Sequence, residues 1–197
     1  MSPFLTEWQA AEKFPGLADN AGLSLEDREM LASAGSLTLE LEERLKASVG
    51  VELQEVRSCR IRPELAAYLG VKPFEEALER DVWLTTEGRR LVYARSVIPH
   101  SCMDEGLRTL LSSGQRPIGK ILGDEGIEFS KDSMEFAIID GQEQGAEFGL
   151  EQAPIYIARR YRLFNRSSDG WTINAAVTEV FTPSLIPIVG GKGVEKI

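Results

Sequence analysis

The chain has 197 residues and a mass of 21.8 kDa, a size that suits one domain with a single hydrophobic core. Hydrophobic residues make up 43% of it, which argues against wholesale disorder. The formal net charge of −9 and the pI of about 4.8 argue against binding to nucleic acid or to an anionic membrane surface. A protein this acidic binds an anion only through a local cluster of arginines or of free backbone N–H groups.

The cysteines and the histidine exclude several kinds of site. Cys59 and Cys102 stand alone, as free thiols of a reducing compartment do. The single histidine, His100, cannot build a multi-histidine metal site and forms no obvious Ser–His or Cys–His pair, so we expect no metal or cofactor. No apolar run reaches the roughly 20 residues of a membrane span, and residues 1–7 lack a signal-peptide pattern. We therefore expect a cytoplasmic protein.

The first elements are two helices. Residues 1–22 carry weak patterning and form a lead-in segment. Ser24, with Asp27 three residues later, predicts the start of a helix that ends near residue 32. Ser36 opens a second helix, which Gly50 ends. Its apolar residues recur one turn apart, at Leu37, Leu41, Leu45 and Val49.

The remaining chain is expected to contain both strands and helices. Strands are expected over residues 51–61, 81–85, 91–98, from about 127, 155–164 and 171–181. A short helix is expected over residues 63–69, with Pro63 in its first turn and Gly70 after it. Further helices are expected over residues 104–113 and from 117. An acidic stretch with glycines, Asp140 to Ala153, is interpreted as a loop. Hairpin-linked strands with helices grouped between them predict an α+β fold with a mostly antiparallel sheet. We divide the chain into the lead-in, one domain over 23–183 and a mobile tail over 184–197.

The predicted hairpin around Glu87-Gly88 places two arginines opposite each other. With a two-residue turn, Arg80 pairs with Arg95 across the strands, and both lie on an otherwise apolar face. Like charges placed opposite one another are destabilising, so the pair indicates an anionic ligand. Alternatively, one or both reach solvent or pair with structural carboxylates.

Glu179 is the second unusual residue. It shares a face of the last strand with Trp171, Ile173, Ala175, Val177 and Phe181. A carboxylate in such a stripe is rarely buried unless it is paired or hydrogen-bonded. It is either a functional group or half of a structural Arg–Glu pair.

Further polar features are weaker. The helix starts near Ser36-Leu37 and Pro117-Ile118 offer free N–H groups, as every helix does. Arg160 and Arg162 share one face of their strand, typical of a solvated face, and Arg159 takes the other. His100 follows a proline at a strand end and is typical of a turn or surface histidine.

These segments together resemble the chorismate lyase family. The resemblance rests on an ordered set of segments: 34–38, 80–84, 93–99, 116–120, 159–163 and 177–183. It reaches from about residue 30 to 183. The departures are Gly35 where the family has an acid, Ala94 where it has glycine, the long loop and the tail, which resemble a divergent branch.

The resemblance implies a six-stranded antiparallel sheet with helices around an internal ligand pocket. It also implies that Arg80 and Glu179 are catalytic: Arg80 grips the ring carboxylate, and Glu179 meets the para oxygen. Backbone N–H groups of Leu37 and Ile118 complete the carboxylate seat, and Arg95 lies along the ligand path. The expected enzyme is a monomer that eliminates pyruvate from chorismate to give 4-hydroxybenzoate, for quinone or related aromatic biosynthesis, without a metal or cofactor.

Two other interpretations stay open. The same fold serves as a small-molecule-sensing domain of transcription regulators, although residues 1–33 are short and not basic enough for a winged helix-turn-helix. The chain could also be a lyase that forms a different hydroxybenzoate from chorismate. Assaying the products from chorismate distinguishes all three.

Overall fold

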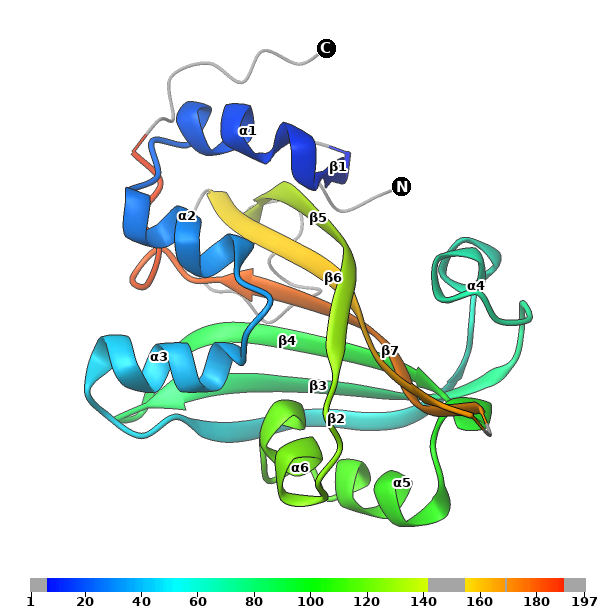
Figure 1. Cartoon of the computed structure of the whole chain (residues 1–197). Coiled ribbons are helices and arrows are strands. Elements are labelled where there is room, and N and C mark those ends of the chain that lie inside the picture. Colours follow the sequence, from blue (N-terminus) through cyan, green and yellow to red (C-terminus); the bar gives the residue numbers. More distant parts are fainter. Residues whose placement is uncertain (1–6, 142–154, 169, 190–197) are drawn as a thin grey trace.

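The computed structural model describes residues 7–141, 155–168 and 170–189 (Figure 1). Its helical elements are η1 (Ala11–Lys13), α1 (Phe14–Asn20), α2 (Leu25–Ala32), α3 (Leu37–Leu45), α4 (Pro63–Leu69), η2 (His100–Cys102), α5 (Glu105–Ser112) and α6 (Ile118–Asp124). Its strands are β1 (Gln9–Ala10), β2 (Gly50–Arg60), β3 (Glu76–Thr86), β4 (Arg89–Pro99), β5 (Ser130–Asp140), β6 (Ile155–Ser167) and β7 (Gly170–Phe181).

The strands form one antiparallel sheet in the order β1-β5-β6-β7-β4-β3-β2. The predicted α+β class with an antiparallel sheet is confirmed. The described residues add a seventh strand to the six expected, because the two residues of β1 pair with Phe136 and Glu135 of β5. A strand this short carries no readable period of two, so the sequence pattern could not reveal it.

Helices cover the sheet unequally. Residues of α1, α2 and α3 pack on one face of the sheet in one apolar cluster, and those of α5 and α6 pack on the same face in a second cluster. We call this the inner face. The opposite, outer face carries an aromatic cluster around Trp83 and Tyr93 and, beside Ala77 and Val97, the helix α4. Figure 1 shows α4 set apart from the other helices.

Local signals explain most helix boundaries. The hydroxyl of Ser24 accepts a hydrogen bond from the N–H of Asp27, which is the predicted cap of α2. Pro63 begins α4 and Gly70 ends it with φ of 66°, as expected. The predicted end of α3 is wrong: the helix stops at Leu45 because Lys46 adopts a left-handed conformation, four residues before Gly50.

The packed part of the chain extends beyond the region of clear sequence pattern at both ends. Phe14 and Leu17 of α1 belong to the first apolar cluster, and the ring of Phe14 stacks on that of Phe136. Leu185 and Ile186 are also buried in this cluster, and Val189 donates a backbone hydrogen bond to Ala21. The predicted loop lies outside the described residues from residue 142 onward. Among the helices that the structure describes, none combines the length and apolar character needed to cross a membrane.

Candidate functional site

The turn of the β3–β4 hairpin has the predicted form, but the register above it differs. Glu87 and Gly88 both have positive φ, 49° and 77°, as a two-residue type I′ turn requires. Thr86 pairs with Arg89 and Thr85 with Arg90, but Leu84 pairs with Val92, so Leu91 is an extra residue in β4. This β-bulge shifts every later pair by one position.

The bulge places Arg80 and Arg95 on opposite faces of the sheet. Arg80 pairs with Ser96, and Arg95 pairs with Asp81. The prediction that the two arginines share a face is therefore wrong, since a one-residue slip turns every side chain of a strand over. No glycine or proline stands at the bulge to mark it in the sequence.

Arg80 lies on the inner face and is 1% exposed. Its Nη2 donates to the carbonyls of Gly114 (3.2 Å) and Arg116 (2.7 Å), at the chain segment that leads into α6. Its buried Nε has no hydrogen-bond partner among the described residues, and no carboxylate of that part of the chain forms an ion pair with it. Burial lowers the pKa of this guanidinium to about 10. A buried guanidinium without a counter-charge is able to bind an anion.

Glu179 lies on the same face, buried between two hydrogen-bond donors. Nε of Arg159 donates to its Oε2 at 2.6 Å, and the hydroxyl of Tyr161 donates to its Oε1 at 2.9 Å. Arg159 is 0% exposed, and its Nη1 donates to the carbonyls of Met30 (2.9 Å) and Leu31 (2.7 Å) in α2. The structural Arg–Glu pair considered from the sequence is thus present, and its arginine is Arg159.

The opposite charges of Arg159 and Glu179 stabilise each other. Burial works against the charge of Arg159, but the carboxylate of Glu179 outweighs it and raises the pKa of the arginine. Burial, together with Glu179, raises the pKa of Tyr161 well above its ordinary value, so its hydroxyl keeps its proton. The arrangement holds Glu179 as an oriented carboxylate with one neutral and one charged donor.

Small side chains separate Arg80 from Glu179. Their strands, β3 and β7, flank β4, where Ala94 pairs with Glu179 and Ser96 pairs with Arg80. From these pairings the two Cα atoms lie roughly 12 Å apart, two strand spacings across and two residues along. Ala94 and Ser96 have short side chains, so they fill less of the space between the guanidinium of Arg80 and the carboxylate of Glu179 than larger residues would. The arrangement suits one planar ring with an anionic substituent at one end and a polar one at the other.

The starts of α3 and α6 meet beside this cluster. A Cβ built on Gly119, in the first turn of α6, would lie 3.5 Å from Oγ of Ser36, the residue that precedes α3. Arg80 contacts the carbonyl of Arg116 just before α6, and Nζ of Lys131 in β5 donates to the carbonyl of Gly35 at 2.5 Å. The structure thus brings the predicted residues Leu37 and Ile118 to adjacent helix starts. We call the set Arg80, Lys131, Arg159, Tyr161 and Glu179, with these two helix starts, the inner-face site.

Three members of the site were not predicted. Arg159 was assigned to the face opposite Arg160 and Arg162, which is confirmed, but its burial was not foreseen. Its alternation with Tyr161 and Leu163, two large residues that also face inward, is the sequence signal that could have revealed it. Lys131 carried no such signal, because β5 has an irregular register between Asp132 and Glu135.

Arg95 lies on the outer face and forms an ion pair with Asp81. Its Nε and Nη2 each donate to Asp81 at 2.9 Å, a two-point ion pair. Burial opposes the charge of Arg95, but Asp81, Tyr93 and Glu79 outweigh it and raise its pKa. This is the structural carboxylate pairing considered from the sequence.

Replacing Arg95 with methionine is therefore expected to lower stability and spare the inner-face site. Asp81 would stay buried without its cation, at a cost of about 2 kcal/mol in the free energy of unfolding. Thermal denaturation beside the steady-state kinetics of the same variant measures both effects. A large loss of kcat/KM with unchanged stability would place Arg95 in the ligand path after all.

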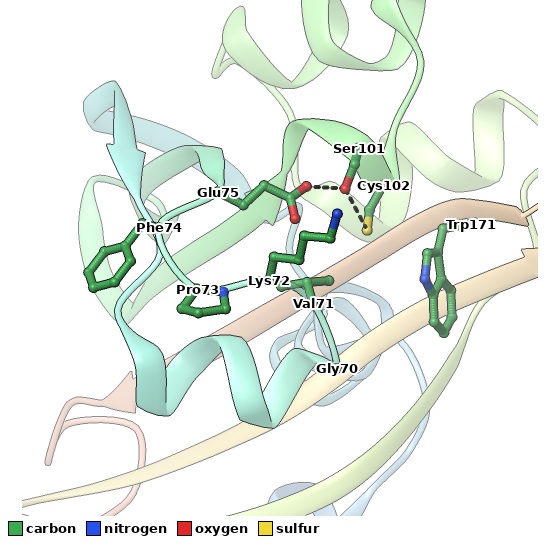
Figure 2. Close-up of a pocket in the computed structure, with 9 residues that line it drawn as sticks. All are labelled: Gly70, Val71, Lys72, Pro73, Phe74, Glu75, Ser101, Cys102 and Trp171. Carbon is green, nitrogen blue, oxygen red and sulfur yellow. Dashed lines mark hydrogen bonds between the residues drawn. The ribbon is translucent and has the colours of Figure 1, made fainter.

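Other candidates lie away from the inner face. A groove of about 770 Å³ is lined by residues 70–75, Ser101, Cys102 and Trp171 (Figure 2). Its lysine, Lys72, is exposed, and the carboxylate of Glu75 accepts a hydrogen bond from Ser101, so the groove lacks the buried unpaired cation of the inner-face site. His100 sits in η2, 4.0 Å from the carboxylate of Glu76, as a turn histidine does. In the part of the chain that the structure describes, no three His, Cys, Asp or Glu side chains could hold a metal ion together.

Solved structures support the fold. PhnF from Mycobacterium smegmatis superposes with a TM-score of 0.59 at 16% identity, over 83% of this chain and 71% of that one. Its separately solved effector domain gives 0.57 at 18% identity, over 76% and 90%. At these identities the likeness concerns the fold alone.

Sequence relatives and a family model agree with each other. Proteins named "Probable chorismate pyruvate-lyase" match from Marinobacter nauticus (34% identity, 48% of this chain and 50% of the relative), Methylococcus capsulatus (36%, 45% and 54%) and Shewanella loihica (27%, 90% and 87%). The chain thus spans about half the length of the first two and most of the third. The family model described as "Chorismate pyruvate-lyase Rv2949c-like" matches residues 31–188, the segment that carries the whole inner-face site. The chain therefore belongs to the Rv2949c-like chorismate pyruvate-lyase family.

Proposed function

We propose that the inner-face site eliminates pyruvate from chorismate and leaves 4-hydroxybenzoate. The observation that carries the proposal is Arg80, a buried cation without a carboxylate partner among the described residues, on the same face as a buried, oriented carboxylate. Burying a charge without a partner is costly, and an anionic ligand repays the cost. Membership of the lyase family agrees with this chemistry.

In the proposed complex Arg80 holds the ring carboxylate of chorismate. The N–H groups of Leu37 and Ile118 face the same carboxylate from the starts of α3 and α6. Glu179 then lies toward the opposite end of the ring, near the hydroxyl and the ether oxygen. The orientation of the ring follows from the order of the residues across β3, β4 and β7.

The reaction breaks the bond between the ring and the ether oxygen. A hydrogen leaves the ring carbon that bears the hydroxyl, the ring becomes aromatic, and the enolpyruvyl group takes up a proton at its methylene carbon to become pyruvate. The hydrogen passes either directly to that methylene or through Glu179. Such a reaction depends on restraint and placement of charge more than on a strong nucleophile.

Arg159 and Tyr161 are positioning residues for Glu179. Their hydrogen bonds fix both carboxylate oxygens, and the contacts of Arg159 with Met30 and Leu31 tie the pair to α2. A carboxylate fixed in this way needs little reorganisation when the ring proton becomes acidic.

A sensor domain is the second candidate, favoured by the fold that the chain shares with the PhnF effector domain. Mixing the purified protein with chorismate and quantifying pyruvate and hydroxybenzoate isomers by chromatography distinguishes the candidates. Equimolar pyruvate and 4-hydroxybenzoate support the lyase. Binding of chorismate without products supports the sensor, and another isomer supports a lyase of different regiochemistry. The monomeric state, the cytoplasmic location, the role in quinone or related aromatic biosynthesis and the domain limits 23–183 stay predictions.

Turnover is expected to be unaffected by excess chelator. The chain has one histidine and two separate cysteines, and the proposed reaction uses arginines, helix starts and a carboxylate. Initial rates before and after prolonged dialysis against a chelator test this. A loss of rate that a divalent cation restores would contradict it.

A further inference from the structure

We infer that Lys131 binds the second carboxylate of the substrate, on the enolpyruvyl group, and so makes the site selective for a dianion. The inference rests on the proposed function, because it names the residue that the proposed substrate needs and that the resemblance does not supply. Chorismate carries two carboxylates, and Arg80 with the two helix starts accounts for one.

The other arginines near the site are already occupied. Arg95 was the expected second cation, but it lies on the outer face in a two-point ion pair with Asp81. The charge of Arg159 is balanced by Glu179 at 2.6 Å. Arg160 and Arg162 lie on the outer face and pair with Glu135 and Asp132.

Lys131 has no such carboxylate. Its Nζ donates to the carbonyl of Gly35 at 2.5 Å and lies 4.4 Å from the centre of the Tyr161 ring. No carboxylate within the described residues lies in ion-pair range of it. An ammonium group has three N–H donors, and these two contacts leave it able to meet an incoming carboxylate.

A chain of contacts joins Lys131 to Arg80 around one site. Lys131 contacts the carbonyl of Gly35, which precedes α3; Ser36 approaches Gly119 at the start of α6; and Arg80 contacts the carbonyl of Arg116. On its other side Lys131 lies over Tyr161, which donates to Glu179. The two cations therefore lie on either side of the helix starts. Of the two, Lys131 is the one nearer the carboxylate of Glu179.

The charge state of Lys131 fits this role at neutral pH. Burial is the largest cause and lowers its pKa to about 8; Glu179 acts against burial, Arg159 adds to the lowering, and Glu40 opposes it. Lys131 is thus charged below about pH 8 and loses its charge above it. Tyr161, which also faces it, keeps its proton throughout this range.

The consequence is a difference between substrate and product. Chorismate engages both Arg80 and Lys131, whereas 4-hydroxybenzoate has one carboxylate and engages Arg80 alone. Elimination thus removes the group that Lys131 holds, as part of pyruvate, and leaves the aromatic product with fewer contacts.

The test compares Lys131→Met and Lys131→Arg with Lys72→Met, which removes an exposed lysine of the groove in Figure 2. Lys131→Met is expected to lower kcat/KM for chorismate about tenfold to 100-fold, the range for a hydrogen bond to a charged group. Its Kd for 4-hydroxybenzoate, measured by calorimetry, should change less than about threefold. Lys72→Met should match the wild type.

A pH profile separates charge from structure. Wild-type kcat/KM, which reports the free enzyme, should fall as pH rises through about 8. Lys131→Arg should keep most of the activity and move this fall to higher pH, since a guanidinium holds its proton. Equal losses for chorismate and 4-hydroxybenzoate in Lys131→Met, or an unchanged pH profile in Lys131→Arg, would overturn the inference. If the wild type binds chorismate without cleaving it, the proposed function fails. Calorimetry then still tests whether Lys131→Met weakens the binding of chorismate, the dianion, and leaves the binding of 4-hydroxybenzoate unchanged.

Discussion

Replacing Arg80 with methionine is expected to lower kcat/KM for chorismate by about 2–5 kcal/mol of transition-state stabilisation, roughly 30-fold to several thousandfold. Methionine keeps much of the length and apolar volume of the side chain but removes the charge that meets the ring carboxylate. The apo protein should be as stable as the wild type or more stable, because the variant no longer buries a guanidinium whose Nε lacks a partner among the described residues. Steady-state kinetics and thermal denaturation of the same sample measure the two quantities.

Arg95→Met is the matched control, because it removes the same group from the neighbouring strand on the other face. The two variants should show opposite patterns: Arg80→Met loses activity and keeps stability, whereas Arg95→Met loses stability and keeps activity. If Arg80→Met unfolds the protein, its hydrogen bonds to Gly114 and Arg116 are its main role, and the site assignment is wrong.

Glu179→Gln is expected to lower kcat by about 100-fold or more, the range for losing one oriented electrostatic group. Glutamine has the same shape and can still accept from Arg159, but it leaves that guanidinium buried without a counter-charge. Removing one partner of a buried pair costs about 3 kcal/mol or more, so the melting temperature should also fall. A variant with wild-type turnover would remove Glu179 from the mechanism.

The double variant Arg159→Met with Glu179→Gln distinguishes catalysis from folding. Replacing both partners removes the unpaired charge, so stability should return close to that of the wild type. The activity should stay low, because the carboxylate is still absent. Recovery of activity together with stability would show that the pair only supports the fold.

Local chemistry made much of the fold predictable. Ser24, Pro63 and Gly70 marked helix ends, and Glu87-Gly88 marked the tip of a hairpin, because each has a short-range physical reason for its place. The left-handed Lys46 that ends α3 and the two-residue β1 depend on tertiary packing and leave no local signal.

The candidate site shows the same division. Arg80 and Glu179 stood out as charges in apolar stripes, and both are buried on the inner face. The prediction that Arg80 and Arg95 share a face was wrong, because one extra residue, Leu91, turns the later side chains of β4 to the opposite face. The register of a strand is the property most sensitive to such an insertion. Lys131 becomes visible only when β5 brings it beside Gly35, which is 96 residues away in the sequence.

The most direct test of the central claim is the product yield from chorismate with the wild type, Arg95→Met and Arg80→Met at equal concentrations of folded protein. We expect equimolar pyruvate and 4-hydroxybenzoate from the first two at similar rates, and at most a few per cent of that rate from Arg80→Met. Equal product formation by all three proteins would contradict the account, because the buried arginine of the inner face would then have no part in the reaction.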